Sequence, residues 1–125
     1  MSGLANFPAD AARQQAGERV ARAVLHIDHF SGAIAKDLQR SKVGLIRELA
    51  RDLSMRAEAI RLGIAMELPG ERLLAPCDDF RETARQLQRV SSKSRLPEAS
   101  KLALQLVIRL EEQVRLDLQQ WNSHT

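Results

Sequence analysis

The sequence predicts an all-α protein, an antiparallel up-down four-helix bundle that we expect to be oligomeric. Aromatic residues make up only 3% of the chain and there is no Tyr, so the core must consist of Leu, Ile, Val and Ala. That composition suits helices packing on helices better than β-sheets. Apolar residues also recur every three or four positions in four segments separated by short breaks. The 125 residues are enough for one core, so we expect a single domain, residues 1–125, ordered over 8–121.

The first two helices are predicted from their apolar stripes. The first is expected to begin near Pro8, a residue suited to the first helical position, and a gap in its stripe at Ser31 and Gly32 favours a bend. Its stripe consists of Ala16, Val20, Val24, Ile27, Ile34 and Leu38. The second is expected to run from Val43 to Leu68 and to end at Pro69-Gly70. Its seam alternates spacings of four and three, as in a heptad repeat, and consists of Ile46, Ala50, Leu53, Ala57, Ile60 and Ile64.

The third and fourth helices each carry a proline followed by acidic residues at the predicted start. The third is expected to open at Pro76 and to end at Ser91-Ser92, with Phe80, Ala84 and Leu87 as its buried stripe. The fourth is expected to begin at Pro97-Glu98. Its predicted stripe consists of Ala103, Leu106, Val107, Leu110, Val114, Leu118 and Trp121.

Composition excludes several classes of protein. The net charge is +3 and there is one cysteine, so the chain cannot form an internal disulfide framework. The first residues lack the charged-then-apolar pattern of a signal peptide. No apolar run approaches the roughly 18 residues of a membrane-spanning helix. We therefore expect a cytoplasmic protein that does not interact with membranes.

The most informative local pattern is a ladder of four basic residues, Arg81, Arg85, Arg89 and Lys93, with Arg95 directly after it. On a helix the spacing of four stacks these like charges into one stripe, which costs about 0.2–0.5 kcal/mol for each neighbouring pair. A polyanionic partner would offset that repulsion. The alternative is a solvated face whose charges pair with Glu82, Glu111 or Glu112.

A second basic set surrounds the first predicted connection. We interpret both sets together as candidate phosphate contacts of an RNA-binding or DNA-binding surface. The second set consists of Lys36, Arg40, Lys42, Arg47 and Arg51.

Residues 34–49 also resemble the helix-turn-helix of certain transposases and repressors. In such a motif two helices cross near a right angle, and Ser41 onward would enter a major groove. Gln39 occupies the turn position usually given to glycine. The second helix continues to Leu68, which is longer than a groove-reading helix requires, so we favour a packing seam here.

Residues with catalytic or metal-binding potential are few. His26 and His29 have a spacing that suits one metal, but the sequence indicates no further ligand. Cys77 is expected at the start of the third helix, where the helix dipole can lower the pKa of a thiol. Because no His or Lys partner is identifiable, we expect a small buried or half-buried thiol instead of a reactive one. There is no Gly-rich phosphate loop and no nucleophile signature. We expect no enzymatic activity, no cofactor and no metal.

Three features point to a known family: the long first helix, the basic connection Arg40-Ser41-Lys42 leading into Arg47-Glu48, and a last helix that runs through Glu111 to Trp121. The chain resembles the small four-helix-bundle proteins that include the accessory variability protein of diversity-generating retroelements and the bundles encoded by ribosomal RNA intervening sequences. The resemblance implies an oligomeric, positively charged barrel that binds nucleic acid beside a reverse transcriptase, with no catalysis of its own. The chain departs from that family in having no Pro near the first connection and no glycine in its last helix.

Three functions follow from these observations. The first is a non-enzymatic nucleic-acid-binding accessory protein, partnering a larger nucleic-acid enzyme. The second is a protein-protein interaction module, such as an adaptor, inhibitor or small complex subunit. The third is a helix-turn-helix DNA-binding regulator. For a protein partner or a homo-oligomer, the contact residues would come from the seam of the second helix and from outlying apolar residues such as Leu45, Leu62, Met66, Leu73, Leu74 and Leu116.

Overall fold

The computed structural model describes residues 2–123, which form four helices and no strand. These are α1 (Ser2–Leu38), α2 (Gly44–Ala65), α3 (Gly70–Ser91) and α4 (Glu98–Ser123). Each helix packs against two others, because consecutive helices are neighbours and α4 packs back on α1. The predicted all-α fold of four packed helices is thus confirmed.

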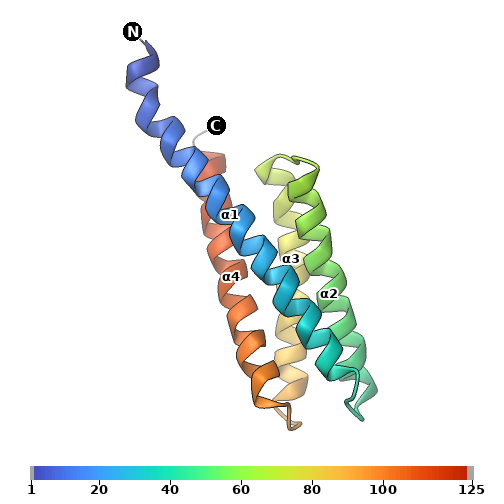
Figure 1. Ribbon diagram of the computed structural model, residues 1–125. Helices are drawn as coiled ribbons and strands as arrows, with labels where there is room; N and C mark the ends of the chain where they lie inside the picture. Colours follow the sequence, from blue (N-terminus) through green and yellow to red (C-terminus); the bar gives the residue numbers. More distant parts are fainter. Residues whose placement is uncertain (1, 124–125) are drawn as a thin grey trace.

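The connections lie at two opposite ends of the molecule (Figure 1). Residues 39–43 and 92–97 form one end, which we call the loop end. Residues 66–69 form the other, which we call the turn end, and both chain termini lie on that side. The N-terminal turns of α1 extend past the other three helices (Figure 1).

The core is built from one heptad seam on each helix. All six residues of the predicted stripe of the first helix are buried in α1, and Ser31, also fully buried, fills the gap between Ile27 and Ile34. The helix therefore continues without a break through Ser31 and Gly32. In α2 the predicted seam is buried except for Ile64, which is half-buried against the core. In α3 the predicted residues are buried, and the buried stripe continues further at both ends, to Leu73 and Ser91.

The observed stripe of α4 is rotated relative to the predicted one. Leu106 is 37% exposed and Leu110 only half-buried, whereas Leu104 is buried. The observed seam alternates spacings of four and three and consists of Ser100, Leu104, Val107, Glu111, Val114 and Leu118. This repeat escapes a count of apolar residues because two of its members are polar. The side chain of Trp121 lies outside the described side chains.

The turn end explains why α3 begins at Gly70, not at Pro76 as predicted. The α2 helix ends in a Schellman motif, in which the Leu68 N–H donates to the Gly63 carbonyl at 3.1 Å and the Glu67 N–H to the Ile64 carbonyl at 3.0 Å. Glu67 takes the left-handed position, with φ 56°, which glycine more often occupies. The chain therefore reverses within residues 66–69.

Burial of Leu73 fixes this early start of α3. Its side chain is 2% exposed and lies so close to Gly63 that a Cβ built there would be 2.8 Å from Leu73 Cδ2. Pro76 then falls inside the helix, where it supplies a helical φ and gives up one backbone donor. The first helix likewise begins at Ser2, before Pro8 rather than near it. In both places the sequence rule takes the proline as the first helical residue. In the structure each proline lies inside the helix, beyond its first turn.

The remaining boundaries agree with the sequence. The α3 helix ends at Ser91, and α4 begins at Glu98 directly after Pro97, both as predicted. The second helix is shorter than predicted at both ends, since residues 66–68 belong to the turn. Among residues 2–123, no helix combines the length and the apolar character needed to cross a bilayer.

Candidate nucleic-acid interface

A groove of about 490 Å³ opens at the loop end, between the two connections. Arg40 and Lys42 line it from the α1–α2 connection, and Arg95 lines it from the α3–α4 connection. Members of both predicted basic sets therefore meet in one groove, although more than fifty residues separate them in the sequence. Its base is apolar, formed by Leu38 and Leu96 among others.

The electrostatic character of this groove follows from its charged lining residues. Asp37 is the acidic residue in the lining, alongside three cations. Arg40, Lys42 and Arg95 are exposed, and none of them forms an ion pair within the part of the chain that the structure describes. We call this feature the basic groove.

The first connection is held by its own hydrogen bonds. The Val43 N–H donates to Ser41 Oγ at 3.2 Å, and an Arg47 guanidinium nitrogen donates to the Ser41 carbonyl at 2.6 Å. Arg47 is thus used locally to shape the connection. The groove edge is therefore fixed by the chain itself. Lys36 and Arg51 are exposed on the neighbouring turns of α1 and α2 and do not line the groove.

The ladder on α3 lies along the side of the bundle. Arg81, Arg85 and Arg89 line a shallow hollow of about 280 Å³ together with Asp78 and Glu82. Successive members are about 6 Å apart along the helix axis, since each residue adds about 1.5 Å. Arg85 and Arg89 are exposed, whereas Arg81 is half-buried. Lys93 follows the end of α3 and is exposed beside the groove connection.

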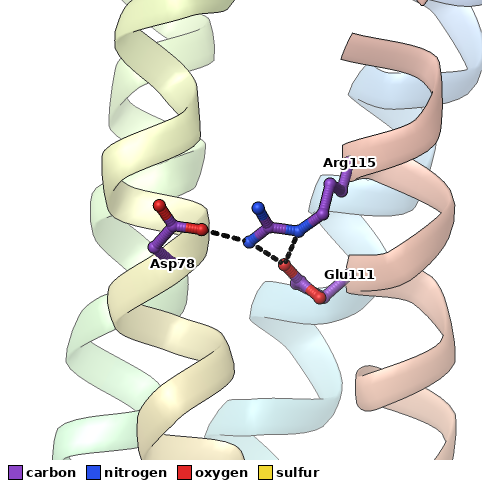
Figure 2. A network of polar contacts seen from close by, with 3 residues as sticks. All are labelled: Asp78, Glu111 and Arg115. Atoms are coloured by element: carbon purple, nitrogen blue, oxygen red, sulfur yellow. Dashed lines mark hydrogen bonds and ion pairs between the residues drawn. The ribbon is translucent and has the colours of Figure 1, made fainter. Parts of the chain in front are cut away.

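Glu111, which the sequence suggested as a partner for the ladder, interacts with the charge of Arg81 but hydrogen-bonds to a residue outside the ladder (Figure 2). It is 1% exposed on α4, and its Oε1 accepts hydrogen bonds from two nitrogens of Arg115, at 2.8 and 3.2 Å. Arg115 also bridges to Asp78 of α3, at 2.5 Å. The network therefore ties α3 to α4. Among the described side chains, residues 11–120, Arg85 and Arg89 form no ion pair.

Burial controls protonation in this network. Desolvation raises the pKa of the Glu111 carboxyl above its ordinary value, because the hydrogen bonds and charge of Arg115 offset the burial only in part. The positive charge of Arg81 also favours the ionised form. Sequence reasoning did not find this site, although the heptad spacing of Glu111 with Leu104 and Val107 was visible.

Cys77 lies close to the charges of the same network, and its thiol is shielded from solvent. It is fully buried inside α3 rather than at a helix start. Burial raises the pKa of its thiol to about 12, and the neighbouring Glu111 charge adds to the effect. The expected burial of the thiol is confirmed, whereas its expected position at a helix start is wrong, because the helix begins seven residues earlier at Gly70.

The other candidate sites do not gain support from the geometry. His26 and His29 make edge-to-face contacts with Phe30, with ring centroids 6.4 and 5.2 Å apart. Within residues 2–123, no group of three or more His, Cys, Asp or Glu side chains is placed to hold a metal ion.

Residues 34–49 cover the end of α1, the first connection and the start of α2. Far from that connection, Arg61 Nε of α2 lies 2.8 Å from Asp28 Oδ2 of α1. The two helices therefore stay side by side, which does not fit the near-right-angle packing of a helix-turn-helix.

Comparison with known proteins adds no relative from which a role can be transferred. No family model matches the chain, and neither the curated proteins nor the solved structures contain a significant match.

Proposed function

We propose that this protein is a non-enzymatic nucleic-acid-binding protein that contacts the phosphates of RNA or DNA with the basic groove and the α3 ladder. The observation that carries the proposal is the convergence of Arg40, Lys42 and Arg95, from two separate connections, on one groove. Cations held together without ion-pair partners repel one another, and phosphate groups relieve that repulsion. Arginine suits this role because its guanidinium binds phosphate through two parallel hydrogen bonds.

We further propose that the bundle is antiparallel and up-down, that it self-associates, and that it acts in the cytoplasm as an accessory to a larger nucleic-acid enzyme. The placement of successive connections at opposite ends supports the topology (Figure 1). The exposed apolar residues Leu45, Leu62, Met66 and Leu116 support a contact between copies. Leu73 and the α2 seam, also predicted as contact residues, are used in the core of the single chain. An oligomer would present several grooves to one polymer and raise its avidity.

The proposal is tested by reversing the groove charges in one variant, Arg40→Glu with Lys42→Glu and Arg95→Glu. Binding of labelled RNA and duplex DNA is measured by fluorescence anisotropy over a series of salt concentrations. We expect the slope of log affinity against log salt to lose about three units, since each phosphate contact contributes about 0.9. Far-UV circular dichroism should be unchanged because all three side chains are exposed.

A matched control separates the groove from overall charge. Arg22→Glu with Arg72→Glu and Arg109→Glu also reverses three exposed arginines that do not line the groove. Each set changes the net charge from +3 to −3, because three reversals remove six units. Equal losses of affinity in the two variants would mean that net charge alone drives binding, and the proposed site would be abandoned.

The contribution of the ladder is measured separately with Arg85→Glu and Arg89→Glu. We expect this pair to remove about two units of the salt slope and to leave helicity intact. Lysine at the same two positions keeps the charge and should retain most of the slope. Unchanged binding by the double reversal would reduce the ladder to a solvated helix face.

A second candidate function, a protein-protein interaction module, is favoured by the outer face of α2. Met55, Ala59, Leu62 and Met66 are exposed there and repeat with the four-three-four spacing of a packing seam. Such a surface suits an apolar partner helix. Binding to a protein that survives the groove reversals, without binding to RNA or DNA, would select this function over the first.

A further inference from the structure

The kind of nucleic acid that fits the basic groove and ladder is indicated by what surrounds them. Two phenylalanine rings can be placed among the described side chains. Phe80 is fully buried in the core, and Phe30 is half-buried against His26 and His29 on α1. Neither lines the basic groove or the hollow of the ladder. Cations, three carboxylates, small polar groups and apolar residues line these two sites, and no aromatic ring on which a base could stack is among the described lining residues.

Single strands and duplexes differ in how much they need such rings. Proteins that bind single strands gain about 1–3 kcal/mol for each base stacked on an aromatic side chain. A flexible strand bound through phosphates alone must also be ordered without that gain. A duplex is already stiff, with a persistence length of about 50 nm, and carries about one negative charge per 1.7 Å of axis. A fixed array of cations therefore favours the duplex.

The geometry of the loop end also presents no recognition helix that could contact the bases. Ser41, which would open a groove-reading helix, is used within its own connection as an acceptor for Val43 and Arg47. The α1 and α2 helices lie side by side there, so neither presents its end as a separate recognition helix. Contacts to phosphates position a protein but carry no sequence information.

Resting on the proposed function, we infer that this surface binds the sugar-phosphate backbone of double-helical nucleic acid without regard to base sequence. The shared chemistry is the regular phosphate array of a duplex, and RNA and DNA are its two possible sources. The groove supplies cations from two connections, and the ladder supplies a second row of cations along α3.

The test compares the intact protein with two labelled 24-base-pair duplexes of unrelated sequence, each as RNA and as DNA, and with the corresponding single strands. Affinities are measured by anisotropy at four salt concentrations. We expect the two sequences to bind within about threefold of each other, which is less than the effect of one mismatched specific contact. We expect each duplex to bind at least about tenfold tighter than its strands, because the described lining of the two sites offers the strands no aromatic side chain for stacking.

Each outcome bears either on the inference or on the proposed function beneath it. Equal or tighter binding of single strands, or a preference above about tenfold for one sequence, would overturn the inference while leaving phosphate binding in place. Absence of binding to every nucleic acid at the lowest salt would overturn the proposed function itself. A difference in affinity between the RNA and DNA duplexes identifies which kind of duplex the protein prefers, since the two helices present different phosphate spacings and grooves.

Discussion

The two ends of this bundle are built on the same seams and carry opposite chemistry. At the turn end, residues 66–69 close α2 onto α3 with one acidic and no basic residue. An apolar pocket of about 320 Å³ lies beside them, lined by residues such as Val20, Leu68 and Leu73. At the loop end, residues 39–43 and 92–97 each contain two basic residues and no acidic one. The seams therefore decide the fold, whereas the connections decide what the molecule can bind.

The largest expected effect comes from truncating equivalent core residues at the two ends. Leu73 and Leu38 are each 2% exposed, so Leu73→Ala and Leu38→Ala should each lower the free energy of unfolding by about 2–5 kcal/mol. Only Leu38 lines the basic groove. We therefore expect Leu38→Ala to weaken nucleic-acid binding as well, and Leu73→Ala to leave it unchanged.

Urea unfolding followed by circular dichroism gives the two stabilities, and anisotropy gives the two affinities. Leu38→Met and Leu73→Met serve as controls that nearly conserve volume and should lose less than about 1.5 kcal/mol. Loss of binding in Leu73→Ala under conditions where it remains folded would show that the two ends are not independent.

A smaller effect, of opposite sign, is expected at the turn end. Glu67 holds a left-handed conformation, φ 56°, which costs a residue with a Cβ about 1–2 kcal/mol relative to the right-handed helix. Glycine adopts it readily, so Glu67→Gly should raise the free energy of unfolding by up to about 1 kcal/mol after its larger backbone entropy is counted. Glu71→Gly, at an exposed helical position nearby, should lower it. If both substitutions destabilise, the turn does not depend on the conformation of Glu67.

The smallest effect is a pH dependence centred between the ends, at Glu111. The folded state raises the pKa of this carboxyl, so the folded protein binds its proton more tightly than the unfolded chain does. The stability of the natural protein therefore falls as pH rises from the ordinary Glu pKa through the raised one, and stays lower above it. Glu111→Gln cannot ionise, so its stability relative to the natural protein should increase as the pH is raised above the ordinary Glu pKa of 4.5.

The measurement is the urea midpoint of both proteins at several pH values from the ordinary Glu pKa up to neutrality. Glu48→Gln removes an exposed carboxylate on α2 that is not among the charges acting on Glu111. It controls for the loss of one surface charge and should show no such gain with pH. A relative stability of Glu111→Gln that is flat or falls with pH would mean that Arg115 compensates the buried charge in full.

The sequence was sufficient for the fold at this level of detail because most core positions are apolar and regularly spaced. The seams of α1, α2 and α3 follow from a repeat that can be counted, as the buried residues Leu53 and Phe80 illustrate. A count of apolar residues missed Glu111 and Ser31, because each is a polar residue at a seam position and its burial is seen only in the packed structure. It also failed at Pro76, because a proline within a helix and one at its start look the same until Leu73 is known to be buried.

The candidate site was predictable in part. The ladder is a local pattern, so Arg85 and Arg89 could be placed on one exposed face from spacing alone. The basic groove depends on two connections meeting in space, and no local pattern brings Arg95 to Arg40. The half-burial of Arg81, in contrast to the exposure of Arg85 and Arg89, could not be predicted from the spacing of the ladder.

The packing of α4 against α1 has a consequence for how the chain matures. This pair makes more extensive contact than any two helices adjacent in sequence, yet it joins the first helix to the last. During synthesis α1 emerges before α4, so the face of α1 that packs against α4 stays uncovered until α4 has been made. The bundle therefore gains its most extensive contact last, and until then the nascent chain exposes apolar helix surface of the kind that promotes aggregation.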